Sequence, residues 1–267
     1  MVTRGTGPDF IESVARGFDV VKAFTPQCPT LTLSEVAART ELSRPTARRM
    51  LLTLIELGYV RESQTGFSLT PRVLDLGLTY IQAHGLWDLA RPHLESLVTQ
   101  THQSSSIAQL DGSDIVYVAR VAVPKIISLA VSIGTRFPAT STSLGRIMLA
   151  DLSPAELEAT LSQPSRSGIE PRYVPGEDEL QAILSQTRAR GWVLTDEHLA
   201  GGIRSIAAPI RDGSGAVIAA ANVTVHAAEV SVEALTDDFL PLLIRTAGDI
   251  SADVARIDQI PRVIAPR

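Results

Sequence analysis

The sequence predicts an α+β chain of two domains: a small helical domain that ends in a β-hairpin, and a larger domain built on an antiparallel sheet. Three observations support this prediction. Apolar residues recur at helical spacing through most of the first 85 residues, whereas the alternating pattern of strands begins near residue 104. The length of 267 residues is sufficient for two domains of ordinary size.

Three helices open the first domain. An apolar stripe predicts the first helix, with Asp9 as its N-cap. Thr32 and Glu35 have the spacing of a capping box, which predicts the start of the second helix. Ser43 is a suitable N-cap for the third helix, and Pro45 is tolerated in its first turn. The stripe of the first helix consists of Ile11, Val14, Phe18 and Val21.

A β-hairpin and a further helix follow. The segment YVRESQTGFSLT alternates around a Gln-Thr-Gly turn, which predicts a two-stranded ribbon packed against the helices. Two helices joined by a tight turn and followed by such a ribbon constitute a winged helix-turn-helix. Leu74, Leu78 and Ile81 predict a fourth helix that links this domain to the next.

The second domain begins with the helical segment WDLARPHLESLVTQT and continues as strands and helices. The predicted strands are SSIAQL, DIVYVARV, IISLAVS, WVLTDE, SIAAPI and AVIAAANVTV, and the predicted helices span 142–151, 153–162, 177–190 and 232–257. Asp111-Gly112 and the segment RDGSG supply turns between neighbouring strands. Strands joined by short turns predict an antiparallel sheet with helices packed on it.

Composition excludes several classes of protein. Hydrophobic residues make up 45% of the chain and charged residues 20%, values typical of a globular protein rather than a disordered or fibrous one. The single cysteine, Cys28, permits no intramolecular disulfide and no thiolate metal cluster. The sequence has no apolar run of the roughly 18 to 20 residues that a membrane span requires, and no apolar signal region at its start. We therefore expect a cytoplasmic protein with no membrane partner.

Charge is divided unevenly between the two domains. The net charge is -5, from 24 Lys and Arg against 29 Asp and Glu. Residues 1–72 contain nine basic and seven acidic side chains, a balance of +2, so the remainder carries -7. This asymmetry indicates that only the first domain meets a polyanion such as DNA.

The third predicted helix has the groups needed to bind DNA. Arginine donates two hydrogen bonds to guanine or binds phosphate, and the free amides of a helix N-terminus also bind phosphate. An arginine-rich helix face can be merely solvated, but the preceding capped helix, the tight turn and the following ribbon favour DNA binding. The predicted DNA-binding residues are Ser43, Arg44, Pro45, Thr46, Arg48 and Arg49 in this helix and Arg61 in the wing.

Three sequence blocks, taken in order, resemble the IclR family of bacterial transcriptional regulators. They are LSEVAARTELSRPTARRMLLTLIELGYV, GTRFPATSTSLGRIMLA and GGIRSIAAPIRDGSGAVIAAANV. The resemblance extends from about residue 10 to residue 258, and within the family it is greatest to regulators of protocatechuate and β-ketoadipate catabolism. One departure is Glu41, because the family commonly has glycine in the turn before the recognition helix.

The resemblance implies a domain organisation and a function. It implies a winged helix-turn-helix over residues 9–70, a linker helix over 71–85 that contributes to dimerisation, and a GAF-like effector-binding domain over 86–260. A homodimer or tetramer would bind a roughly palindromic double-stranded operator. A small carboxylate from aromatic-acid catabolism would modulate that binding. We expect no cofactor, no metal and no enzyme activity.

The block RFPATSTSLGR contains the candidate effector site. Four hydroxyls stand where a helix begins, and the free amides and positive dipole end of that helix suit a carboxylate, to which Arg136 or Arg146 could add charge. The hydroxyls could equally cap the helix and face water. The resemblance favours a pocket and adds residues from TDEHLAGGIRSIAA. The candidate effector residues are Arg136, Thr140, Ser141, Thr142, Ser143, Thr195, Asp196, Gly202, Ile203 and Ser205.

Two other functions stay open from the residues alone. Ser205, His198 and Asp196 could form a hydrolase triad, although the chain has no G-x-S-x-G motif before a helix. A winged helix can also serve as a protein adaptor, which would leave the arginines of the third helix without a specific role. His198 is more typical of a polar loop residue than of a metal ligand, because no second histidine lies at helical spacing.

Overall fold

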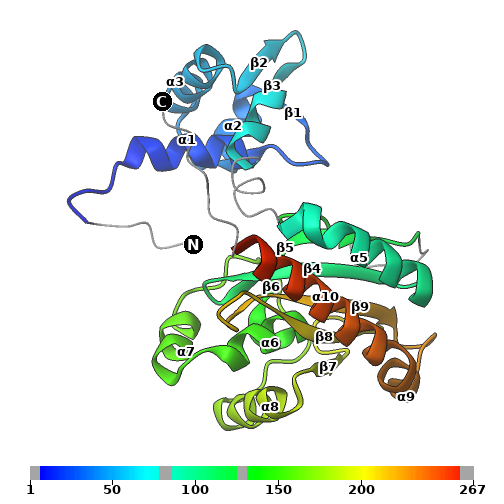
Figure 1. The fold of residues 1–267 in the computed structure, drawn as a ribbon. Coiled ribbons are helices and arrows are strands. Elements are labelled where there is room, and N and C mark those ends of the chain that lie inside the picture. The colour runs from blue at the N-terminus through cyan, green and yellow to red at the C-terminus, as the bar shows by residue number, and fades with distance from the viewer. Residues whose placement is uncertain (1–6, 78–85, 125–130, 259–267) are drawn as a thin grey trace, which may run out of the picture. The chain divides into compact units, whose positions relative to one another are not determined.

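The computed structural model describes residues 7–77, 86–124 and 131–258, and the chain divides into two compact units, Met1–Ala83 and His84–Arg267. The N-terminal unit contains helices α1 (Glu12–Ala23), α2 (Leu33–Arg39) and α3 (Arg44–Glu56) and strands β1 (Thr30–Leu31), β2 (Val60–Ser63) and β3 (Gly66–Leu69) (Figure 1). Its strands form an antiparallel sheet in the order β1-β3-β2. The predicted winged helix-turn-helix is confirmed, with β1 as an additional strand that the sequence did not predict.

The predicted helix caps are correct for α2 and α3 but wrong for α1. Thr32 and Glu35 form the capping box of α2, and the Ser43 hydroxyl accepts a hydrogen bond from the amide of Thr46 at the start of α3. Helix α1 begins after Ile11 with no side-chain cap. Asp9 is not its N-cap, because it lies two residues before the cap position and the helix starts later than predicted.

The three helices and the sheet of the N-terminal unit enclose an apolar core. Leu57, the residue that follows the end of α3, is 51% exposed. In the turn between α2 and α3, Glu41 has a φ of 54°, a left-handed conformation that glycine adopts with less strain. The turn therefore keeps a glycine-like geometry with a glutamate in it. The buried core residues include Val20, Leu31, Val36, Ala47, Leu51, Leu54, Val60 and Phe67.

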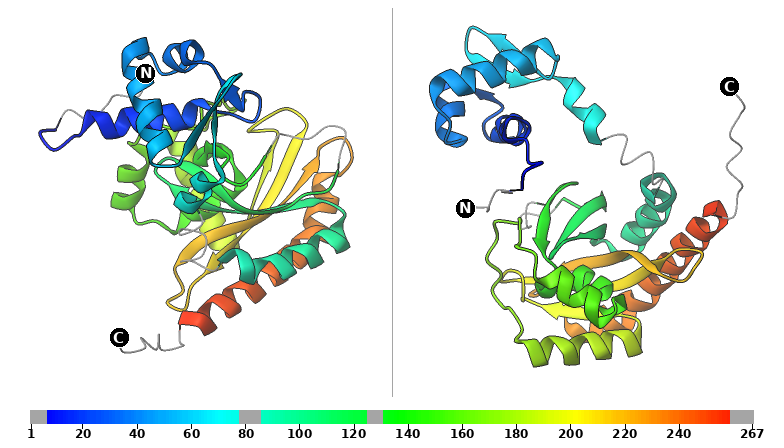
Figure 2. Two further views of the ribbon diagram at one scale, coloured as in Figure 1. Left: turned by 90° about the horizontal axis from the view of Figure 1, so that it is seen from above. Right: turned by 90° about the vertical axis from the view of Figure 1, so that its left-hand side faces the viewer.

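The C-terminal unit is an antiparallel sheet between two layers of helices, with strand order β6-β5-β4-β9-β8-β7. Helices α5 and α10 cover one face, and α6, α7 and α8 cover the other (Figures 1 and 2). The strands are β4 (Ser104–Asp111), β5 (Asp114–Val121), β6 (Arg136–Pro138), β7 (Val193–Asp196), β8 (Ile203–Arg211) and β9 (Val217–His226). The helices are α5 (Leu86–Thr101), α6 (Ser143–Asp151), α7 (Pro154–Leu161), α8 (Glu177–Arg190), α9 (Val232–Ala234) and α10 (Leu240–Asp258).

Both faces of this sheet are buried, which explains the nearly continuous apolar sequence of β9. Ala221 and Val223 pack into the core beside α5 and α10, and Ala220 packs into the core beside α6. Because side chains alternate along a strand, Asn222 and Thr224 share the face of Ala220. The face covered by α6 therefore carries polar side chains within an apolar sheet.

Two predicted elements fall partly outside the described residues. Most of the predicted strand IISLAVS lies at 125–130, which is not described, and Val131 and Ser132 are not in a strand. Of the predicted linker helix, Pro71–Val73 form a 3-10 turn and residues 74–77 are helical, while 78–85 are not described. The domain boundaries given above, at 9–70, 71–85 and 86–260, remain predictions. Among the described helices, none combines the length and apolar character of a membrane span.

Candidate functional site

Helix α3 presents two arginines to solvent. It buries Ala47, Leu51 and Leu54 in the core and exposes Arg48 and Arg49 on its other side. Neither guanidinium has a hydrogen bond or ion pair with another described residue. A recognition helix that follows a tight turn inserts its exposed side into the major groove of DNA, so both groups are placed to reach base edges or phosphates.

The remaining predicted DNA-binding residues lie at the start of α3 and on the wing. Ser43 caps the helix, and Pro45 and Thr46 lie in its first turn. Arg44 donates to the Ser34 hydroxyl at 2.7 Å, and Arg61 on β2 donates to the Ser68 hydroxyl at 3.1 Å. Both arginines are exposed and are oriented by neutral hydroxyls, which leaves their charge available to phosphate.

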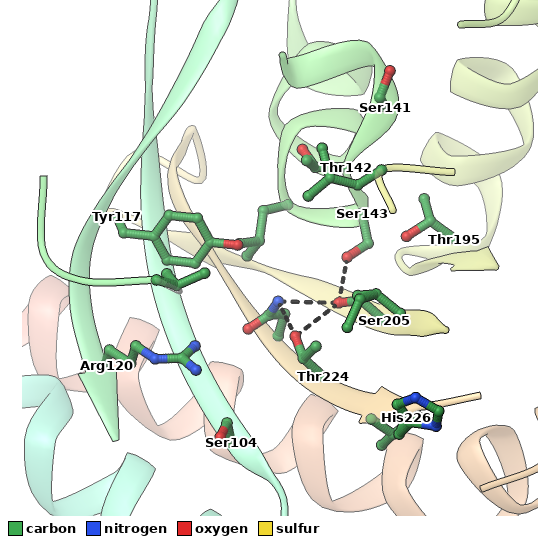
Figure 3. A pocket seen from close by; sticks show the side chains of 16 residues that line it. Ser104, Tyr117, Arg120, Ser141, Thr142, Ser143, Thr195, Ser205, Thr224 and His226 are labelled. Carbon is green, nitrogen blue, oxygen red and sulfur yellow. Dashed lines mark hydrogen bonds between the residues drawn. The ribbon is translucent and has the colours of Figure 1, made fainter. Parts of the chain in front are cut away.

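A polar pocket lies in the C-terminal unit between the sheet and the beginning of α6 (Figure 3). Its volume is about 60 Å³. Six of the predicted effector residues line it, namely Ser141, Thr142, Ser143, Thr195, Ile203 and Ser205. Sequence reasoning missed the polar lining residues Ser104, Tyr117, Arg120, Asn222, Thr224 and His226.

One side of the pocket is a cluster of hydrogen-bonded side chains. The Ser143 and Ser205 hydroxyls are 2.9 Å apart, and the Asn222 amide donates to Ser205 at 3.0 Å and to the Thr224 hydroxyl at 2.9 Å (Figure 3). The Asn222 side-chain oxygen accepts from the Ser106 amide at 3.1 Å, which fixes its orientation. Hydroxyls that rotate can donate to or accept from a ligand, so this cluster suits a polar group of either kind.

The other side of the pocket carries Tyr117 and Arg120, both from β5 (Figure 3). The Tyr117 hydroxyl has no hydrogen-bond partner among the described residues, and burial raises its pKa to about 12, so it stays a donor. Arg120 is half-buried and donates to the Ser106 hydroxyl at 2.9 Å, with no ion pair to a described carboxylate. Burial lowers the pKa of its guanidinium. A partly desolvated cation that lacks an anion favours an anionic ligand.

A bulge explains how two side chains of β5 that are three residues apart reach the same pocket. Ile107 pairs with Ala119, but Ala108 pairs with Tyr117, so β5 has one extra residue at this point. In a regular strand, residues three apart point to opposite faces. The extra residue places Tyr117 and Arg120 on one face, as bulges do when they redirect a side chain.

Four predicted effector residues lie outside the pocket lining. Arg136 forms an ion pair with Asp111 and lies 3.6 Å from the carboxylate of Asp114, so its charge is directed away from the pocket. Thr140 uses its carbonyl to accept a hydrogen bond from Arg146. The other predicted cation, Arg146, is 2% exposed and does not line the pocket.

Asp196 and Gly202 have structural contacts. Asp196 accepts two hydrogen bonds from Arg204, at 2.8 and 2.9 Å. Gly202 has a φ of 74° and packs against His226, so that a Cβ at this position would lie 2.8 Å from the His226 Nε2. It therefore shapes the loop beside the pocket.

The hydroxyls at the beginning of α6 divide between the two roles predicted for them, which are to cap the helix and to line a pocket. The Thr142 hydroxyl caps the helix by accepting from the Gly145 amide at 3.1 Å, whereas the Ser143 hydroxyl faces the pocket cluster. The Ser141 hydroxyl donates to the Tyr173 carbonyl. Gly145 permits a close approach, because a Cβ there would lie 2.2 Å from the Ala139 carbonyl oxygen.

The three residues of the possible hydrolase triad do not assemble. Ser205 bonds to the pocket hydroxyls and to Asn222, and Asp196 is engaged by Arg204. The His198 Nδ1 accepts from Arg146. No hydrogen bond joins any two of Ser205, His198 and Asp196 among the described contacts, so the relay that activates a serine nucleophile is not formed.

The chain has a winged helix with exposed arginines, and an α+β unit with a polar pocket follows it. This combination defines a DNA-binding regulator with an appended domain. Models of two families match the chain. The IclR helix-turn-helix domain matches residues 13–64, and the C-terminal domain of the bacterial transcriptional regulator IclR matches residues 78–252. The chain belongs to the IclR family and is a DNA-binding transcriptional regulator, not an enzyme.

Individual relatives agree with this assignment. The Pca regulon regulatory protein of Pseudomonas putida is 40% identical over 91% of this chain and 84% of its own length. The crystal structure of a transcriptional regulator from Rhodococcus sp. RHA1 is 46% identical, with a TM-score of 0.81 over 93% of this chain and 100% of that one. A double mutant of the PobR inducer-binding domain from Acinetobacter, solved with 3-hydroxybenzoic acid, is 28% identical, with a TM-score of 0.56 over 61% of this chain and 96% of that one. The predicted likeness to regulators of the Pca branch is confirmed.

Proposed function

We propose that this regulator binds a small aromatic carboxylate in the pocket of its C-terminal unit, and that the bound acid changes its affinity for a palindromic operator. The observation that carries the proposal is Arg120, a half-buried guanidinium that lines a hydroxyl-rich pocket and has no carboxylate partner among the described residues. The aromatic acid bound by the PobR domain supports the same class of ligand.

The two sides of the pocket suit the two ends of a hydroxylated aromatic acid. Arg120 would donate charge-assisted hydrogen bonds to the carboxylate, with the Tyr117 hydroxyl as a further donor. The cluster of Ser143, Ser205 and Thr224 would exchange hydrogen bonds with ring hydroxyls. For the acid to change operator affinity tenfold, it must bind the two states of the regulator with affinities that differ by about 1.4 kcal/mol.

The operator would be bound by paired α3 helices of a homo-oligomer. Ile11, Val14 and Phe18 of the predicted apolar stripe are 63%, 54% and 50% exposed, a face that a second copy of this chain would cover. Two-fold pairing of the helices requires half-sites separated by about 10 base pairs or a multiple of this number. Sedimentation of the Val14→Lys, Phe18→Lys variant should show dissociation, and an unchanged mass would contradict this interface.

Calorimetry on the full chain tests the effector site. The probes are 3-hydroxybenzoate, protocatechuate and β-ketoadipate, with benzyl alcohol as an uncharged aromatic control. We expect heat of binding for 3-hydroxybenzoate or protocatechuate and none for the alcohol, because Arg120 requires an anion. The absence of heat with every acid would refute the effector proposal and leave DNA binding unaffected.

The operator contacts are tested on DNA that co-purifies with the protein from its host and is then sequenced. The Arg48→Ala, Arg49→Ala variant should lose operator binding in a gel-shift titration, and each bidentate base contact contributes about 1–3 kcal/mol. A matched variant, Arg190→Ala, Arg256→Ala, removes the same charge from exposed positions of the C-terminal unit and should bind as the wild type does. Equal affinity of all three proteins would refute the assignment of α3.

A further inference from the structure

A buried arginine lies immediately behind the wall of the pocket. Arg146, on α6, is 2% exposed and forms no ion pair with a described carboxylate. Its Nε donates to the Thr140 carbonyl at 2.8 Å, and its Nη2 donates to the His198 Nδ1 at 2.9 Å. Burial lowers the pKa of the guanidinium to about 10, so it is charged at neutral pH. A buried cation with only neutral acceptors depends on each of them.

The contact with Arg146 fixes the protonation state of His198. A guanidinium donates hydrogen bonds and accepts none, so the His198 Nδ1 must carry a lone pair and the ring proton must be on Nε2. Protonation of Nδ1 would remove the acceptor. It would also place an imidazolium against a guanidinium, two cations at contact distance.

Through this contact, Arg146 joins two walls of the pocket. The first turn of its helix lines the pocket, and His198 directly precedes Leu199, another lining residue. The connection continues into the segment before α8. The Tyr173 amide donates to the His198 carbonyl at 2.9 Å, the Ser141 hydroxyl donates to the Tyr173 carbonyl at 2.9 Å, and the Tyr173 and His198 rings pack with centroids 4.6 Å apart.

We propose that Arg146 and His198 are positioning residues of the pocket. Neutral His198 holds the loop after β7 against α6, and protonation of His198 releases this loop and weakens binding of the acid. The inference rests on the effector site proposed above and adds to it a dependence of effector affinity on pH. Neither side chain needs to contact the acid, because their hydrogen bond acts by holding the loop after β7 against α6, and both of these segments line the pocket.

The charged and titratable groups around His198 determine the direction of this dependence. Arg146 faces the ring from α6, Tyr173 from the segment before α8, Glu179 from α8 and Asp196 from β7. Burial and Arg146 lower the pKa of His198 below 6.5, and the two carboxylates offset this only in part. The neutral ring is therefore favoured in the folded chain. The contact is complete above pH 6.5 and is lost as the pH falls through the lowered pKa.

Calorimetry with 3-hydroxybenzoate between pH 7.5 and 5.5 tests the inference, since a carboxylic acid that titrates near about 4 stays ionised in this range. Because the pKa of His198 lies below 6.5 and one proton is coupled to binding, wild-type affinity should fall between pH 7.5 and 5.5 by at most about tenfold. His198→Asn keeps an acceptor near the position of Nδ1 but does not titrate, so its affinity should not change with pH. An asparagine variant that loses affinity as the wild type does would overturn the inference.

A matched variant and a measurement without the acid complete the test. His226→Gln removes the histidine that lines the pocket itself and should keep the pH dependence of the wild type, whatever its effect on affinity. Loss of that dependence would assign it to His226 instead.

Hydrogen exchange of the Tyr173 amide, corrected for its intrinsic rate, should lose protection at pH 5.5 in the wild type and not in His198→Asn. Equal protection in both proteins would overturn the inference even if no acid binds. Absence of binding at every pH would refute only the effector site.

Discussion

Replacing Arg120 by glutamine removes the charge that faces the pocket and keeps a donor for the Ser106 hydroxyl. In the structure, Nη1 of Arg120 makes that bond at 2.9 Å, and the guanidinium extends into the pocket (Figure 3). A hydrogen bond to a charged group contributes about 1.5–3 kcal/mol, so losing one carboxylate contact should weaken 3-hydroxybenzoate binding by about 10- to 150-fold. The dissociation constant is measured by calorimetry on the full chain.

The same substitution should leave the melting temperature unchanged or slightly raised. Burial lowers the pKa of Arg120, which means that the folded, ligand-free chain carries a desolvation cost at this site. Arg136→Gln is the matched control, because it makes the same change of charge at an arginine that pairs with Asp111 outside the pocket. Unaltered affinity in Arg120→Gln, or an equal loss in both variants, would refute the assignment of Arg120 as the carboxylate-binding group.

Three further changes have defined expected outcomes. Glu41→Gly relieves a left-handed glutamate and should raise the free energy of unfolding by about 1 kcal/mol in a denaturant titration; a decrease would contradict the strain argument. Gly145→Ala introduces a Cβ 2.2 Å from a carbonyl oxygen and should destabilise the chain by about 1–3 kcal/mol. This destabilisation is measured as a lower melting temperature, and an unchanged melting temperature would contradict the predicted clash. Arg61→Gln should lower the slope of log affinity against log salt by about 1 without altering operator preference, and a changed preference would indicate a base contact.

Features that depend on a few neighbouring residues were predictable from the sequence. The capping box of Thr32 and Glu35 and the cap at Ser43 are local arrangements, and the structure has them where the spacing placed them. The exposed position of Arg48 and Arg49 follows from the apolar spacing of the same helix. Such signals do not require knowledge of how distant segments meet.

The polar lining of the pocket was only partly predictable. Arg120 was missed because its direction depends on the bulge opposite Ile107, which no local pattern reveals. Arg136 was chosen for its closeness in sequence to the hydroxyls of α6, but the pairing of β5 with β6 brings it beside Asp111 instead. A signal for Asn222 was present, since a polar residue within an otherwise apolar strand must find partners when buried.

The order of strands in the C-terminal unit has a consequence for biosynthesis. Its two middle strands, β4 and β9, come from opposite ends of the domain: the hydroxyl of Ser105 and the carbonyl of Asn222 that it binds are separated by 117 positions. On the ribosome, the hairpin of β4 and β5 leaves one edge unpaired until β9 has been synthesised, an edge that invites pairing with other chains. A premature stop codon anywhere before residue 217 would remove β9, the strand that lies between β4 and β8 in this sheet, and would leave β4 and β8 without their shared neighbour.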